Sequence, residues 1–147
     1  NLANDDVIAL LNVHYQDMLL HSPEESVHAF DVSKLAADDV TFWTAWIDNE
    51  LAGCGALKQL DHKHGEIKSM RTDNAHLRKG VAAGLLAHIL QQATQLGLKR
   101  VSLETGTAQA FKPALTLYQK AGFVDCAPFA DYDVDPYSQF MSLALAD

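Results

Sequence analysis

The stretch that decides the fold is GEIKSMRTDNAHLRKGVAAGLLAHILQQATQL, residues 65–96. It reads as a short strand, a tight basic turn with one glycine, and a long amphipathic helix. The turn, residues 77–82, carries two cations and leaves backbone N–H groups without partners at the start of the helix. Such donors, reinforced by the helix dipole, suit a phosphate or pyrophosphate. We therefore expect a bound anion at this turn.

The helix after the turn has apolar residues four apart, namely Val81, Leu85, Ile89 and Ala93. This spacing predicts that one broad face of the helix is buried on a sheet. Gly97 follows the last apolar position and is typical of the residue that ends a helix.

Working outward, β-branched and aromatic runs alternate with turn residues. Strands are expected at 40–47, 51–57, 66–71, 101–104, 123–124 and 140–145, and helices at 5–20 and 112–121. Asp48-Asn49 marks a hairpin turn, and a short helix or loop runs from Pro23 to about Leu35. The order β-β-β-α-β-α-β-β after an N-terminal helical region predicts an α+β fold, a mixed sheet flanked by helices in one domain.

Bulk properties narrow the class of protein. The 147 residues carry a formal net charge of -8, which argues against a nucleic-acid binder and mildly favours a cationic partner such as an amine. No signal peptide is visible and no apolar stretch approaches the roughly 20 residues that span a bilayer, so we expect no membrane partner. Cys54 and Cys126 form neither a zinc motif nor a disulfide framework, which indicates a reducing, cytoplasmic environment. Since the chain begins at Asn1 without Met, we expect an incomplete or processed form that lacks a short first strand.

The turn alone is not specific, since it has neither the GKS/GKT of a P-loop nor GxGxxG. A second segment, ALTLYQKAGF at 114–123, follows at the distance of one strand and one helix. Together the two segments resemble the GNAT superfamily of N-acetyltransferases, with its Q/R-x-x-G-x-G/A turn and its helix ending in LYxKxGF. Gly80 and Ala82 match the turn, and residues 117–118 and 120–123 match the helix end. The resemblance covers roughly residues 40–145 and implies a GNAT-like acyl-CoA N-acyltransferase fold.

The resemblance also implies where acetyl-CoA binds as co-substrate, without a metal. In the family the strand before the turn bulges or splays, and its main chain bonds the pantetheine arm while the turn holds the pyrophosphate. The matching positions here are Met70, Arg71, Thr72, Leu77, Arg78, Lys79, Gly80, Val81, Ala82 and Phe111. Leu77 replaces a family Gln or Arg, and Phe111 replaces a frequent Asn. Arg78 and Lys79 are able to supply the charge that Leu77 lacks.

The chemistry needs a deprotonated amine and a proton for the departing thiolate. Tyr118 matches the family's general acid, and Glu66 matches a strand position where some members place a base that acts directly or through water. Glu104 is the reserve candidate for the base. Strand alternation would put Glu66 on one face with Lys68 and Met70. The alternatives are a packing role for Tyr118 and a surface role for Glu66.

Seven histidines show no metal-ligand spacing, and each is expected to be a surface or loop residue. Glu24 and Glu25, after the first helix, are weaker candidates for an acceptor pocket, because they equally suit the first turn of a helix. A serine hydrolase is excluded because the sequence has no GxSxG.

The sequence thus predicts an N-acetyltransferase that joins acetyl-CoA and a primary amine in a ternary complex. The amine belongs to a small molecule or a protein: an amino acid, a polyamine, an aminoglycoside-like drug or a protein N-terminus. An acyl-CoA sensor without turnover stays open because of Leu77 and Phe111, and a structural subunit with a vestigial site is a third reading. The family resemblance also makes a homodimer an expectation.

Overall fold

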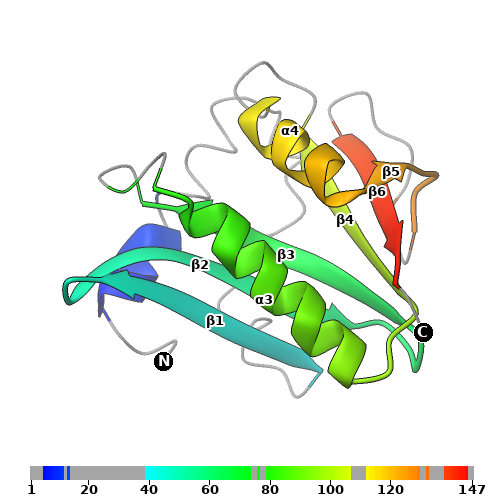
Figure 1. Cartoon of the computed structure of the whole chain (residues 1–147), viewed down its shortest axis with the longest axis horizontal. Helices are drawn as coiled ribbons and strands as arrows, with labels where there is room; N and C mark the ends of the chain where they lie inside the picture. The colour runs from blue at the N-terminus through cyan, green and yellow to red at the C-terminus, as the bar shows by residue number, and fades with distance from the viewer. Residues whose placement is uncertain are drawn as a thin grey trace.

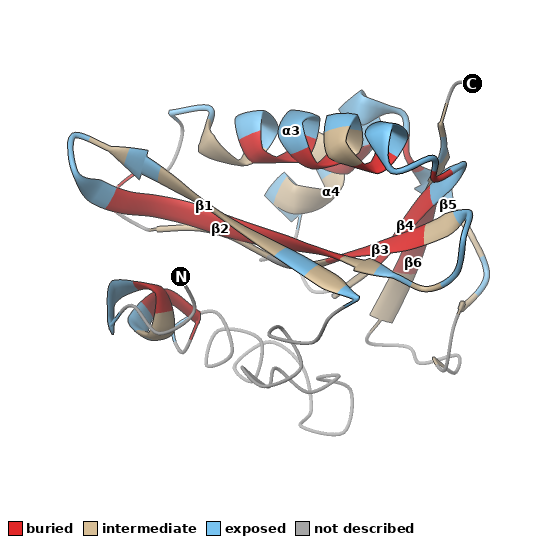
Figure 2. Ribbon diagram, turned by 90° about the horizontal axis from the view of Figure 1, so that it is seen from below, coloured by how far each residue is buried: buried red, intermediate tan, exposed pale blue. Residues whose placement is uncertain are grey.

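The computed structural model describes residues 5–11, 13, 39–73, 76, 79–106, 112–129, 132 and 138–145. Six strands form one sheet in the order β1-β2-β3-β4-β6-β5. Their bounds are β1 Val40–Ile47, β2 Glu50–Gln59, β3 His64–Thr72, β4 Arg100–Gly106, β5 Val124–Asp125 and β6 Ser138–Ala144. Helices α3 (Val81–Gln95) and α4 (Lys112–Ala121) cover one face, and helical residues 5–11 lie under the other (Figures 1 and 2). The predicted α+β order is confirmed.

The hairpin predicted at Asp48-Asn49 is present. Both residues have positive φ, 49° and 68°, which is the backbone of the turn type that suits a two-residue hairpin. β2 and β3 run further than predicted, since Lys58 pairs with Val40 and Gln59 pairs with Gly65. Backbone pairing extends the strands over polar residues that a hydrophobic pattern does not detect.

Helix α3 lies across the sheet and buries Leu85, Leu86, Ile89 and Ala93, close to the predicted face. Gly55 on β2 permits this approach, because a Cβ there would lie 2.9 Å from Ile89 Cδ1 and 2.5 Å from Met70 Sδ. A Cβ does not approach other atoms this closely in proteins, so a side chain at this position would force the Met70 and Ile89 side chains to shift.

Both helices end in the same way, at a glycine with positive φ. After α3, Gly97 (φ 84°) and Leu98 donate their N–H groups to Thr94 O and Ala93 O. After α4, the corresponding bonds run from Gly122 to Gln119 O and from Phe123 to Tyr118 O. The rings of Tyr118 and Phe123 meet edge to face at 5.6 Å, the apolar contact that accompanies this helix ending. The segment ALTLYQKAGF therefore has a structural reason to hold both aromatic residues.

The sheet opens at its centre. The parallel β3–β4 ladder covers four residue pairs, from His64–Arg100 to Ile67–Leu103, whereas the β4–β6 ladder covers seven. β3 continues to Thr72 and β4 to Gly106, and Figure 1 shows the two strands diverging. The middle of the sheet is thus a place where two strand edges separate.

On the face opposite α3, Val7, Leu10 and Leu11 pack against Leu51, Cys54 and Ala56 in a second apolar cluster. The predicted helix over 5–20 is confirmed for residues 5–11 and 13. The rest of that helix and the acceptor-pocket candidates Glu24 and Glu25 lie outside the described residues. No helix among the described residues is long and apolar enough to cross a membrane.

Candidate active site

The start of α3 has the geometry that the glycine turn predicts. Gly80 is the residue that precedes the helix, in the left-handed conformation (φ 80°, ψ 12°), and makes no side-chain cap. The N–H of Gly84 donates to Gly80 O at 3.0 Å. The preceding N–H groups, at Val81, Ala82 and Ala83, have no acceptor within a helix and point out of its positive end. They are suited to an anion.

Lys79, beside this helix start, is held by a buried histidine. Its Nζ donates to His76 Nδ1 at 3.1 Å, and His76 Nε2 lies 3.2 Å from Glu50 Oε1. The expectation that each histidine is a surface or loop residue is wrong for His64, which is partly buried on β3. His76 lies between β3 and α3, in keeping with a loop position, but only 4% of the residue is exposed. A loop position gives no sequence signal that its side chain turns inward. Leu77, Arg78 and Phe111 lie outside the described residues.

Met70, Arg71 and Thr72 lie on β3 beyond the end of its ladder with β4. On one edge of β3, Arg71 and Thr72 pair with Cys54 and Gly53 of β2. The opposite edge of β3 faces β4, but the ladder with β4 has ended before these residues. This edge of β3 runs from the centre of the sheet towards the start of α3.

The strand alternation predicted for β3 fails at Met70. Ala56 pairs with Lys68 but Cys54 pairs with Arg71, so two residues of β3 oppose Gly55 in a β-bulge. The extra residue puts Met70 against Ile89 of α3, on the face opposite Glu66 and Lys68. The bulge that the family resemblance implies is therefore present, and it removes Met70 from the Glu66 face.

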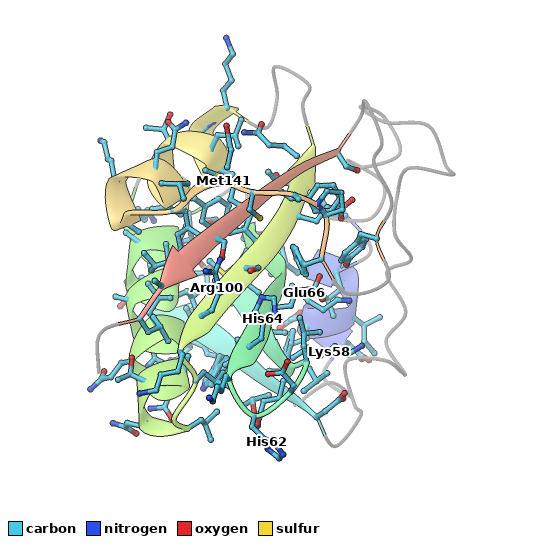
Figure 3. All side chains as sticks on the ribbon, turned by 90° about the vertical axis from the view of Figure 1, so that its right-hand side faces the viewer. Lys58, His62, His64, Glu66, Arg100 and Met141 are labelled. Atoms are coloured by element: carbon cyan, nitrogen blue, oxygen red, sulfur yellow. The ribbon has the colours of Figure 1, made fainter. Side chains whose placement is uncertain are left out.

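Glu66 is a buried carboxylate at the point where β3 and β4 separate. Its exposure is 3%, and it pairs with Lys58 on β2 and Ser102 on β4. Figure 3 labels Glu66 with its neighbours Lys58 and His64. Tyr132 Oη donates to Glu66 Oε2 at 2.6 Å, and Lys68 Nζ lies 3.9 Å from Oε1. The surface role considered for Glu66 is therefore wrong.

Burial raises the pKa of Glu66 above its usual value, while Lys68, the Tyr132 hydrogen bond and Lys58 oppose the rise and Glu104 adds to it. A carboxyl with a raised pKa is a stronger base than an exposed one. The arrangement suits a group that accepts a proton near neutral pH.

Glu104, the reserve candidate, lies on the adjacent strand, just past the end of the β3–β4 ladder. Its Oε2 accepts a 2.7 Å hydrogen bond from Ser138 Oγ on β6. It is partly buried. The structure thus offers two carboxylates near the opening, each with a hydroxyl donor.

Tyr118 belongs to α4, which covers the face of the sheet opposite Glu66 (Figure 2). It is 6% exposed and belongs to the core cluster that contains Ile67 and Leu103, the last residues of the ladder. Burial raises the pKa of its phenol above the usual value of 10, so the group is protonated at every pH of interest. A protonated phenol is able to donate to a leaving thiolate.

A chain of hydrogen-bonded polar side chains crosses three strands beside Glu66, and no sequence motif predicts it. His64 Nε2 lies 2.6 Å from Ser102 Oγ, which donates to Ser142 Oγ at 3.1 Å, and Arg100 Nη1 donates to Ser142 Oγ at 2.9 Å. Burial, assisted by Arg100, lowers the pKa of His64, against the effects of Asp61 and Glu66. Because Ser102 donates its proton to Ser142, His64 Nε2 is the donor to Ser102, and the lowered pKa favours the neutral imidazole.

Metal and thiol chemistry find little support in this part of the molecule. Among the described residues, no group of three His, Cys, Asp or Glu side chains is arranged to hold a metal ion. Burial raises the pKa of the Cys54 thiol to about 12, which leaves it unreactive near neutral pH.

Comparisons with known proteins agree with this geometry. A family model described as the acetyltransferase (GNAT) family matches residues 5–123. The chain is 53% identical over 145 residues to the uncharacterized N-acetyltransferase YsnE of Bacillus subtilis, covering 99% of this chain and 96% of that protein. It is 54% identical over 147 residues to the uncharacterized N-acetyltransferase YedL of Escherichia coli, covering 100% and 92%.

The fold is also that of a solved structure with a bound coenzyme. A GNAT family acetyltransferase from Elizabethkingia anophelis with acetyl-CoA bound superposes with a TM-score of 0.65 at 20% identity, covering 87% of this chain and 88% of that one. At this identity the likeness concerns the fold alone.

Proposed function

The chain belongs to the GNAT family of acetyltransferases, and on that premise we propose that it transfers acetyl from acetyl-CoA to a primary amine by direct attack in a ternary complex. The observation that carries the proposal is the early end of the β3–β4 ladder at Ile67–Leu103. Glu66 lies one pair before this point, and Tyr118 belongs to the core cluster on the opposite face of the sheet, which contains Ile67 and Leu103. A thioester placed there would be within reach of a base on one side and an acid on the other.

The coenzyme would lie along one path from the helix to the sheet. The N–H groups after Gly80 and the Lys79 ammonium would hold the pyrophosphate, which is anionic. The pantetheine amides would pair with the edge of β3 at residues 70–72, as an added strand does. Backbone groups carry most of this grip, so Leu77 in place of a polar residue is compatible with it.

The reaction would proceed in one displacement. Glu66, directly or through a water, takes a proton from the ammonium form of the acceptor, and the free amine nitrogen attacks the thioester carbonyl carbon. A new C–N bond forms, the C–S bond breaks, and Tyr118 donates its proton to the departing thiolate. The attacking nitrogen loses its second proton as the amide forms, and that proton restores the Tyr118 phenol. Backbone N–H groups near Met70 would stabilise the oxyanion.

The acceptor would be an amine that binds near a buried carboxylate, Glu66, and a partly buried one, Glu104. Glu66 and Glu104 give the opening two acidic groups, and a cationic amine would be attracted to them. An amino acid, a polyamine, an aminoglycoside-like compound and a protein N-terminus all satisfy this requirement.

A thiol-release assay on a panel of such amines tests the proposal. Turnover with at least one amine, together with a thermal shift on adding acetyl-CoA, is the expected result. Tight acetyl-CoA binding without turnover on any amine would favour the sensor role instead. The absence of any coenzyme-induced shift would overturn the proposed coenzyme site.

A further inference from the structure

We propose that Tyr132 is a positioning residue that orients the Glu66 carboxylate and keeps it ready to accept the proton of the amine. This inference rests on the proposed function, in which Glu66 is the base. Tyr132 lies between β5 and β6, and no sequence motif includes it.

The geometry at Glu66 separates its two oxygens. Tyr132 Oη lies 2.6 Å from Oε2, a distance typical of a strong hydrogen bond from a hydroxyl to a carboxylate. Oε1 faces Lys68 Nζ at 3.9 Å, longer than a hydrogen bond. With Oε2 engaged by Tyr132, Oε1 is the oxygen that meets the amine or its water.

The Tyr132 ring is held in place by other aromatic rings. Its centroid lies 5.3 Å from that of Phe129 and 5.6 Å from that of Phe140, and these two rings meet each other at 5.8 Å. Phe140 is anchored in β6, opposite Glu104 of β4. These edge-on and tilted contacts at 5–6 Å are favourable, so the hydroxyl is delivered to Glu66 by a packed cluster rather than by an isolated side chain.

Several neighbouring groups decide how readily the Glu66 carboxyl loses its proton. Lys68 on β3 and Lys58 on β2 favour the carboxylate form, whereas burial and Glu104 on β4 disfavour it. His64 on β3 also interacts with the carboxylate. Burial and the Glu66 charge raise the pKa of the Tyr132 phenol above its usual value, so Tyr132 remains a donor throughout the working pH range.

Loss of this donor has a defined kinetic consequence. A hydrogen bond to the charged form of an acid lowers its pKa, and removal of the bond raises the pKa. In Tyr132→Phe less of the base would be deprotonated at a given pH, so the acid limb of the kcat/KM profile moves to higher pH. A purely structural role would lower stability or overall rate without moving this limb.

The experiment compares pH profiles of kcat/KM from about pH 5 to pH 9 for wild type, Tyr132→Phe and Ser138→Ala. Ser138→Ala is the matched control, since it removes a hydroxyl donor from the other carboxylate, Glu104, at 2.7 Å. We expect Tyr132→Phe to shift the acid limb upward by about one pH unit, the worth of one charge-assisted hydrogen bond. KM for acetyl-CoA should stay within about twofold of wild type, and Ser138→Ala should leave the limb in place.

Two further measurements separate the possible failures. Glu66→Gln should abolish the limb, and if it keeps both rate and limb, Glu66 is not the base and the proposed proton step fails. If Glu66→Gln abolishes the limb but Tyr132→Phe leaves it unmoved, only the role of Tyr132 is overturned. A carboxyl-carbon NMR titration of Glu66 in wild type and Tyr132→Phe reads the same shift without turnover.

A second substitution keeps the proposal testable if the Tyr132→Phe variant does not fold correctly. Fluorotyrosine at position 132 keeps the ring and strengthens the donor, so the limb should move to lower pH. A limb that moves upward or stays fixed with fluorotyrosine overturns the proposal.

Discussion

Gly80 and Gly84 lie at the turn proposed to bind the pyrophosphate and in the helix that follows it, and their substitution by Ala should change stability in opposite directions. A Cβ at Gly80 or at Gly84 would meet no atom within 4 Å, so substitution by Ala at either site causes no clash. The two differ in backbone: Gly80 has φ 80°, whereas Gly84 lies inside α3. Any difference between the two variants therefore reports the backbone conformation.

The expected changes in the free energy of unfolding are similar in size. Ala in the left-handed conformation costs about 1 kcal/mol or somewhat more relative to Gly, so Gly80→Ala should be destabilised. Ala within a helix is favoured over Gly by about 1 kcal/mol, so Gly84→Ala should be stabilised. For a domain of this size each change corresponds to about 3 °C in Tm, in opposite directions.

Coenzyme affinity should separate the same two variants. Relief of strain in Gly80→Ala would tilt the first turn and remove at least one N–H from the pyrophosphate, which weakens acetyl-CoA binding by about tenfold or more. The Gly84 N–H already donates to Gly80 O, so Gly84→Ala should bind as wild type does.

Thermal unfolding by circular dichroism and titration calorimetry with acetyl-CoA make both measurements. A Gly80→Ala variant as stable as wild type, or a Gly84→Ala variant that is destabilised, would refute the reasoning from backbone conformation. A Gly80→Ala variant that binds acetyl-CoA normally would refute the placement of the pyrophosphate.

The remaining predictions concern the charged and acid–base groups. Tyr118→Phe should lower kcat by about a hundredfold or more, with the Phe123 ring contact kept and Tm within a few degrees; a loss of less than a few-fold at all pH values would exclude Tyr118 as the acid. Lys79→Met should raise KM for acetyl-CoA by about tenfold, while Lys120→Met, a change at an exposed cation at the end of α4, should leave it unchanged; equal effects would contradict a specific contact. The raised pKa of Glu66 means that its contribution to stability is present below its usual value of 4.5 and is lost as pH rises through the folded value. Glu66→Gln should therefore gain stability relative to wild type as pH rises from about 4.5 towards neutral, and a Tm difference that does not change with pH would contradict the raised pKa.

Local rules made much of the fold predictable. The hairpin turn at Asp48-Asn49 and the helix ends at Gly97 and Gly122 follow from a few neighbouring residues, and all three have a positive-φ backbone. The apolar period of α3 predicted its buried face, because a helix shows its environment in its own sequence.

The candidate site was predictable only in part. Glu66 and Tyr118 were identified through the family resemblance, and their burial agrees with the roles proposed for them. Tyr132 was missed, because its partner Glu66 lies 66 positions away in the chain. The burial of His76 was not predicted, because a loop residue carries no periodic signal that it is buried.

The sequence by itself determined the order of the elements from β1 to β6, where α3 and α4 begin and end, and the glycine turn suited to an anion, because each depends on backbone limits within a few residues. The tertiary structure decided where the β3–β4 ladder ends, the bulge that turns Met70 away from Glu66, and which hydroxyl reaches that carboxylate. Those features arise when strands distant in the chain pair in one register and a packed aromatic cluster fixes a side chain, and no local pattern encodes such contacts.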